Sequence, residues 1–230
     1  MRNYSHEEAW EKSLIASLEM ASPAQGLIRI MKGAYPTLPI VPKKGVSLDM
    51  GCGDGRNTLF LQSLGFDSYG VEITSTIIDQ LRERIPGSKF KVGSNANIPF
   101  PDDFFDLIVS WHAIYYMGDD RNRDLSQNLD ECFSKLKKNG ESCFIVSVPC
   151  PSSFIFDKSE IARESAGVEY RIIKNDPFDI RNGEMLATFQ NKEMMSKTLK
   201  QVGFSEVIIG EEFGNWFGFQ YDWWVAVCKI

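Results

Sequence analysis

Short apolar runs alternate with stretches of helical periodicity from residue 46 onward. The run VSLDM is short and apolar enough for a buried strand, and GRNTLFLQSLG after it has apolar residues at helical spacing. The same alternation continues to Pro149. It predicts strands over 46–50, 68–73, 89–93, 105–110 and 142–148, and helices over 55–65, 76–85 and 121–140. Strands that alternate with helices favour a parallel sheet covered on both faces.

The last third of the chain departs from this alternation. Residues 150–187 do not repeat the strand–helix unit, although 159–167 has the composition of a short helix. Beyond them the pattern predicts a helix over 191–204 and strands over 205–213 and 222–230. The segment between these two strands is too short for a helical crossover, so we expect them to pair antiparallel.

The first 33 residues are expected to form an N-terminal helical cap. Ser5 has a glutamate three residues later, which is the spacing of a capping box, and apolar residues at helical intervals follow. A second short helix is expected over 24–33. Tyr4 and Trp10 of the cap would then be available to close over a ligand.

The stretch VSLDMGCGDGRNTLFL places three glycines between two apolar runs. A strand, a glycine turn and a helix together present backbone N–H groups to a ligand, and Gly51 and Gly53 allow close approach to the backbone. A dinucleotide fingerprint needs glycine at its sixth position, where Arg56 stands, and no Gly-Lys-Ser/Thr of a P-loop follows. The acid before the turn, Asp49, suits a ligand with an ammonium group rather than a diphosphate.

A second acid lies at the end of the next expected strand. Glu72 follows Gly51 by 21 residues. An acid at this edge of a parallel sheet faces the ligand crevice and can accept hydrogen bonds from two ribose hydroxyls. One acid for an amino group and one for a ribose describe S-adenosylmethionine.

With these motifs, residues 46–148 resemble the class I S-adenosylmethionine-dependent methyltransferases. LDMGCGDGRNTLFL is similar to the first motif of that family, GVEIT to its second-strand acid, and LKKNGESCFIVSVP to its turn and fifth strand. The resemblance implies an α/β, three-layer Rossmann-like fold with a seven-stranded, mostly parallel sheet in the order 3-2-1-4-5-7-6 and strand 7 antiparallel. It also implies one methyltransferase domain over 1–230 and S-adenosyl-L-methionine as the cofactor.

The resemblance further implies roles for individual residues. Asp49 and the glycines would hold the methionine portion, and Glu72 the ribose. Ser94 stands where the family usually has Asp, so Asn95 is a second candidate for the adenine amino group. The expected cofactor-binding residues are Asp49, Gly51, Cys52, Gly53, Glu72, Ile73, Ser94, Asn95, Ala96, Ser110 and Trp111.

Methyl transfer from a sulfonium is an in-line displacement that depends chiefly on alignment, and a base is needed only where the acceptor must lose a proton. The segment SWHAIYYMGDD, after the fourth expected strand, is the place for acceptor-handling residues. His112 is either a base or a residue that packs beside the cofactor, and Tyr115 and Tyr116 are candidates for orienting the acceptor. Cys150 is expected to be a thiol that is buried or at the rim of the site, and no metal is expected.

Composition excludes several function classes. The formal charge of −6 over 230 residues argues against nucleic acid as the partner. The five cysteines are scattered, with neither a disulfide framework nor a zinc spacing. The charged first 20 residues are not expected to be a signal peptide, and no apolar run is long enough to span a membrane. We expect a cytoplasmic protein.

The acceptor is expected to be a small molecule, enclosed by residues 150–187 acting as a substrate lid. The aromatic segment 213–224 is expected to be a hairpin packed on the sheet, or else a wall for an apolar acceptor or the surface of a homodimer. Two alternatives to a small-molecule methyltransferase stay open: a catalytically inactive cofactor-binding or partner subunit, and a protein methyltransferase.

Overall fold

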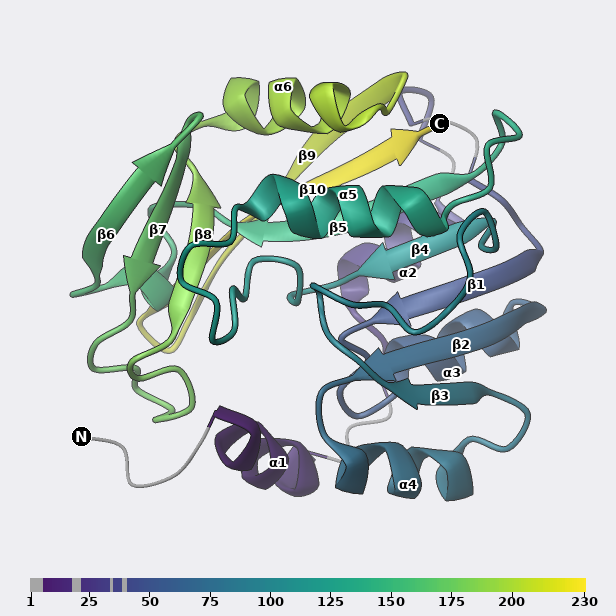
Figure 1. Ribbon diagram of the computed structural model, residues 1–230, viewed down its shortest axis with the longest axis horizontal. Coiled ribbons are helices and arrows are strands. Elements are labelled where there is room, and N and C mark those ends of the chain that lie inside the picture. The colour runs from purple at the N-terminus through teal and green to yellow at the C-terminus, as the bar shows by residue number, and fades with distance from the viewer. Residues whose placement is uncertain (1–5, 18–21, 34, 39–40) are drawn as a thin grey trace.

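The structure, a computed structural model, describes residues 6–17, 22–33, 35–38 and 41–230 (Figure 1). Tyr4 and the expected helix cap Ser5 lie outside the described residues. The chain forms a seven-stranded sheet in the order β3-β2-β1-β4-β5-β10-β9. The strands are β1 (Gly45–Met50), β2 (Phe66–Glu72), β3 (Lys89–Val92), β4 (Leu107–Ser110), β5 (Cys143–Pro149), β9 (Glu206–Trp216) and β10 (Phe219–Lys229).

The register of the sheet confirms the predicted topology. The pairs β1–β2, β1–β4, β2–β3 and β4–β5 are parallel. Strand β10 runs antiparallel to both β5 and β9, as expected for two strands joined by a tight turn. Strands β9 and β10 thus correspond to strands 6 and 7 of the predicted order, and the fold is the expected Rossmann-like α/β arrangement.

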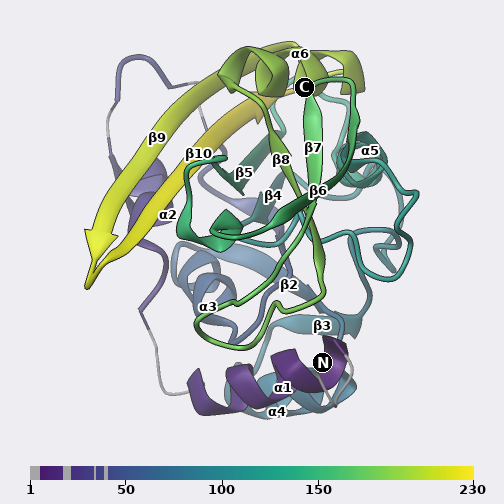
Figure 2. The same cartoon turned by 90° about the vertical axis from the view of Figure 1, so that its left-hand side faces the viewer.

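Helices cover both faces of this sheet (Figures 1 and 2). One core cluster joins α2 (Gln25–Lys32) and α3 (Arg56–Ser63) to β4, β5 and β10. A larger cluster on the other face joins α5 (Leu125–Lys135) and α6 (Lys192–Val202) to the same strands. Helix α4 (Ser75–Arg84) lies beside β3, and α1 (His6–Ser17) packs against α4. None of the described helices has the length and apolar character of a membrane span.

The helix predicted over 159–167 is wrong, because this segment is extended. Residues 154–189 contain a 3₁₀ turn (Phe154–Phe156) and a separate antiparallel sheet, formed by β6 (Glu160–Ser165), β7 (Val168–Ile172) and β8 (Met185–Phe189). Ala166 and Gly167, with φ of 49° and 80°, make the two-residue turn between β6 and β7. Pairing with β7 outweighs the helix propensity of this alanine- and glutamate-containing segment.

The helix predicted over 121–140 is shorter than expected. It begins at Leu125, after a capping box formed by Asp124 and Gln127, and ends at Lys135. Leu136 is extended, and the N–H of Lys137 donates to the carbonyl of Phe105, so the chain leaves the helix to pair beside β4.

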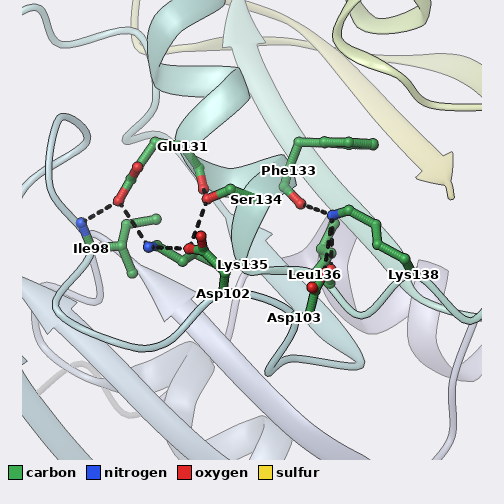
Figure 3. A network of polar contacts seen from close by, with 9 residues as sticks. All are labelled: Ile98, Asp102, Asp103, Glu131, Phe133, Ser134, Lys135, Leu136 and Lys138. Carbon is green, nitrogen blue, oxygen red and sulfur yellow. Dashed lines mark hydrogen bonds and ion pairs between the residues drawn. The ribbon is translucent and has the colours of Figure 1, made fainter.

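A polar network fixes the end of α5 to the segment that enters β4 (Figure 3). Lys135 Nζ lies 2.6 Å from Asp102 Oδ1, and Glu131 Oε1 accepts the N–H of Ile98 at 2.8 Å. Lys138 Nζ donates to the carbonyls of Phe133 and Leu136. The network restrains residues 98–106, which connect the loop after β3 to β4, so it positions two edges of the site described below.

Candidate functional site

The turn after β1 adopts a conformation that suits glycine. Gly51, Gly53 and Gly55 have φ of 68°, 51° and 77°. A Cβ on Gly51 would lie 2.4 Å from the Cβ of Ala113, so the turn and the segment after β4 pack too closely for a side chain. The N–H of Cys52 donates to the carbonyl of Val71, which ties the turn to β2. The turn is therefore a fixed surface of backbone atoms.

Asp49 lies behind this turn and is 1% exposed. It accepts a hydrogen bond of 2.7 Å from Thr58 Oγ1 of α3. Burial raises the pKa of Asp49 to about 7, although the Thr58 hydrogen bond acts in the opposite direction. A cation placed near this carboxyl would therefore favour its ionised form.

Glu72 ends β2 and is 8% exposed. Its Oε2 accepts the N–H of Gly53 at 3.0 Å, and its Oε1 accepts the N–H of Ile73 at 2.7 Å. The side chain is thus held rigidly at the mouth of the glycine turn.

The loop after β3 forms the next part of the site. Ser94 and Asn97 make a small bridge, and the N–H of Ala96 donates to Ser94 Oγ at 3.2 Å. Asn95 donates both hydrogens of its amide to backbone carbonyls, of Ala113 at 2.8 Å and Tyr116 at 3.1 Å. Only the amide oxygen of Asn95 remains as a partner for a ligand N–H group.

His112 follows β4 in a left-handed conformation, with φ of 61°. Its backbone N–H donates to Ser147 Oγ at 2.8 Å, and its ring stacks on Trp223 with 3.8 Å between centroids. Burial, followed by the positive charges of Arg56 and Arg181, lowers the pKa of His112 to about 3. The imidazole is therefore uncharged at neutral pH, and Nε2 has no hydrogen-bond partner within the described part of the chain.

The two tyrosines after His112 lie beside the smaller sheet. The carbonyl of Tyr115 accepts the N–H of Ala187 at 2.9 Å, Tyr116 bridges to Leu186, and the N–H of Met117 donates to the carbonyl of Met185. Residues 115–117 therefore extend that sheet next to β8. The Tyr115 ring is 1% exposed, and the Tyr116 hydroxyl accepts a hydrogen bond of 2.9 Å from Arg181 Nε.

One cavity of about 870 Å³ brings these groups together. All the residues predicted from the sequence line it except Asp49 and Ser110, which are buried behind its wall. The wall also contains Trp10 and Leu14 of α1, and Phe154, Ile155, Ile180 and Arg181 of the segment 150–187. Tyr221 and Trp223 of the aromatic segment 213–224 line it too, so the hairpin also forms part of the cavity wall. Residues of the wall that no sequence pattern pointed to include Asp54, Arg56, Asn57, Arg123 and Asn128.

The aromatic segment 213–224 is a hairpin, as preferred from the sequence. It turns at Phe217 and Gly218, and Trp223 is buried at the cavity wall while Phe217 is 96% exposed. Cys150 is buried, as expected. Within the described residues, no cluster of three or more His, Cys, Asp or Glu side chains could hold a metal ion.

Comparison with known proteins agrees with this geometry. Residues 48–144 match the family model of a methyltransferase domain. A relative from Mycolicibacterium smegmatis, described as a probable S-adenosylmethionine-dependent methyltransferase, is 28% identical over 102 residues, which are 44% of this chain and 37% of the relative. The matched segment is thus little more than a third of that protein's length.

Solved structures share the whole fold at low sequence identity. A methyltransferase from Thermotoga maritima, described as a possible histamine N-methyltransferase, has a TM-score of 0.61 at 18% identity and covers 97% of this chain and 98% of its own. The 1,6-didemethyltoxoflavin-N1-methyltransferase of Burkholderia thailandensis has a TM-score of 0.59 at 12% identity, with 100% and 92% covered. That structure contains 1,6-didemethyltoxoflavin and S-adenosylhomocysteine.

Proposed function

We propose that the chain, whose residues 48–144 match the family model of a methyltransferase domain, is a class I S-adenosylmethionine-dependent methyltransferase that transfers a methyl group to a small molecule. The relatives and the fold support S-adenosylmethionine as the cofactor. One observation carries the proposal for the acceptor: a single cavity runs from the glycine turn and Glu72 to an aromatic end beneath Phe154 and Arg181. A cavity of about 870 Å³ has the size of a small-molecule site.

The residues at the first end of the cavity fit the cofactor. We assign the ribose to Glu72, whose carboxylate is held at the cavity wall by two backbone N–H groups at the carboxyl end of β2. The backbone of Gly51 to Gly53 would line the methionine portion, with the buried Asp49 behind it favouring an ammonium group. Ser94 and Ala96 would flank the adenine, and the amide oxygen of Asn95 would accept its amino group. When bound, S-adenosylmethionine supplies a methyl group activated on a sulfonium.

The residues at the other end would hold and orient the acceptor. Burial lowers the pKa of His112 to about 3, which makes its imidazole a weak base. We therefore assign it as a hydrogen-bond acceptor beside the reacting group. Tyr115 and Tyr116 form a stacked pair, with 4.8 Å between their rings, that can restrict a flat acceptor. Alignment of this kind is the main contribution that an in-line displacement requires.

Two segments add to the wall of the cavity and narrow it, which favours a small acceptor over a peptide. Helix α1 contributes Glu7, Trp10, Ser13 and Leu14, and the lid segment, residues 150–187, contributes Phe154, Ile155, Ile180 and Arg181. We propose that α1 acts as a cap and the lid segment as a substrate lid. Small acceptors are also named for the two methyltransferases of this fold described above.

Calorimetric titration with S-adenosylmethionine and S-adenosylhomocysteine tests the cofactor assignment. We expect micromolar binding of both, followed by methyl transfer to members of a small-molecule panel. Absence of binding to a folded sample would contradict the proposal. Methylation of proteins or peptides, with no transfer to small molecules, would contradict the acceptor class alone.

A further inference from the structure

We propose that Arg181 is the anion-binding residue of the acceptor pocket, and that the methyl acceptor is therefore an acid with a flat, apolar body. The inference rests on the proposed function and names the chemical class of its acceptor.

The guanidinium of Arg181 is fixed on the cavity wall by a residue of its own loop and by two residues that are distant in sequence. Its Nε donates to the hydroxyl of Tyr116 at 2.9 Å, its Nη1 approaches Asp176, and the group lies over the ring of Trp10 at 5.6 Å. The side chain is 14% exposed. A guanidinium that is already ordered loses little further conformational freedom when it binds a ligand.

Asp176 is the acidic partner of Arg181 and contacts the guanidinium through Nη1 alone. The carboxylate of Asp176 already accepts the backbone N–H groups of Ile180 at 2.9 Å and Arg181 at 3.0 Å. The distances from Nη1 to its two oxygens are 3.3 and 3.4 Å, longer than the roughly 2.7–2.9 Å typical of charge-assisted hydrogen bonds. Asp176 therefore holds the loop of residues 176–181 together and contacts one edge of the guanidinium, which leaves Nη2 for another partner.

Part of the guanidinium is left for a ligand. Within the described ranges, Nη2 of Arg181 has no hydrogen-bond or ion-pair partner, while the residue lines the cavity. Burial acts to lower the pKa of Arg181, but Tyr116, Tyr115 and Asp176 outweigh it and raise the pKa above its usual value. The group is thus a permanent cation with donors to spare, and such a group binds carboxylates.

The acidic residues of the wall have their own partners or are exposed to solvent, and a further half-buried cation of the wall, Arg123, donates to Asn128 and to the carbonyl of Gln127. Glu72 accepts two backbone N–H groups at the glycine turn, and Asp54 pairs with Arg56. The remaining acidic residues of the wall, Glu7, Asp119 and Asp120, are exposed to solvent. An anion at Arg181 would therefore meet a buried cation, with the acids at the rim or at the cofactor end.

The surroundings of Arg181 are aromatic, which defines the rest of the ligand. Phe154 packs against Tyr221 at 4.7 Å and against Phe178 at 6.0 Å, so the loop that carries Arg181 is joined to the β9–β10 hairpin. Phe154, Tyr116 and Tyr221 all line the cavity. An aromatic carboxylate would place its ring against these faces and its carboxylate on Nη2.

The test compares acids with their neutral amides. The protein is saturated with S-adenosylhomocysteine and titrated with benzoate, 2-naphthoate, benzamide and 2-naphthamide. We expect at least one acid to bind, and to bind at least tenfold more tightly than its amide. Arg181→Met should remove this tenfold preference and Arg181→Lys should keep part of it, with amide binding unchanged within about twofold.

Arg171→Met is the matched control. Arg171 belongs to the same segment, is 18% exposed and pairs with Glu169, but does not line the cavity. The Arg171→Met variant should therefore keep the preference for acids over amides. A general loosening of the lid segment would affect both variants, whereas loss of anion recognition affects only the Arg181 variants.

Three results would overturn the inference. In the wild-type protein, these are equal affinity for acid and amide, or no binding of any acid at millimolar concentration. The third is a loss of S-adenosylhomocysteine affinity in Arg181→Met, which would assign the residue to the cofactor. Failure of the folded wild-type protein to bind S-adenosylhomocysteine would instead remove the proposed function, and the two failures are read from separate titrations.

Discussion

The carboxylate of Glu72 accepts a hydrogen bond from the backbone N–H of Gly53, 3.0 Å away, and so fastens the end of β2 to the turn after β1. The same side chain accepts the N–H of Ile73. The acid therefore has two tasks, to shape the glycine turn and to present oxygens to the cavity. A substitution at Glu72 has to be interpreted with both in mind.

Glu72→Ala should weaken binding of S-adenosylhomocysteine by at least tenfold while circular dichroism stays that of a folded protein. It removes the acceptor for the ribose and leaves two backbone N–H groups unpaired, which costs roughly 1–3 kcal/mol for each group that stays buried. Glu72→Gln keeps one oxygen and should bind more tightly than Glu72→Ala. Glu83→Ala, at an exposed position of α4, is the control for calorimetry. Unchanged affinity in Glu72→Ala would refute the ribose assignment.

Gly51→Ala should abolish measurable cofactor binding. The new Cβ would lie 2.4 Å from Ala113 Cβ in a backbone with φ of 68°, so the turn or the segment after β4 must move. Gly65→Ala is a matched control, because Gly65 also has positive φ, 94°, but has open space around the added Cβ. It should cost roughly 1 kcal/mol of stability and leave affinity unchanged. Equal effects on affinity would mean that backbone strain, not the close approach, governs binding.

Asp49 should make the unliganded protein less stable as pH rises from about 4 to about 7. Its folded pKa of about 7 lies above the unfolded value of roughly 3.9, so the folded state binds more protons in this range. The free energy of unfolding should fall by up to about 1.4 kcal/mol per pH unit relative to Asp49→Asn. Urea unfolding of both proteins at several pH values measures the difference. Parallel curves would show that the carboxyl is ionised throughout.

His112 should remain uncharged from pH 5 to pH 8, because its pKa lies near 3. Its imidazole NMR signals should therefore not titrate in this range, and a midpoint near 6.5 would contradict the buried environment. Once an acceptor is found, His112→Ala should lower turnover and leave affinity for S-adenosylhomocysteine unchanged. Full turnover at saturating acceptor would exclude a role for His112 in the reaction.

The sheet and the cofactor end of the site were predictable because their signals are local. Each parallel strand is a short apolar run. Asp49, the glycines and Glu72 lie at or directly after the carboxyl ends of two such strands, which meet at one edge of the sheet. The alternating apolar pattern and the short connection between β9 and β10 sufficed for strand direction, whereas the strand order followed from the family resemblance.

The acceptor end was only partly predictable. The segment that becomes β6 is an exposed edge strand, so it lacks the buried alternation that would distinguish it from a helix. Arg181 lies in a loop without periodicity, and its partners Trp10, Tyr116 and Asp176 include two that are more than 60 positions away. The Ala166–Gly167 turn was the one local signal for the β6–β7 hairpin.

The pairing of residues 115–117 with β8 has a consequence for protein engineering. The carbonyl of Tyr115 and the N–H of Met117 are bonded to β8, so the smaller sheet and the segment after β4 form one continuous unit. A chimaera that grafts residues 150–187 onto another scaffold of this fold would leave β8 with an unpaired edge. Transplanted acceptor selectivity should therefore require that residues 112–117 travel with the graft.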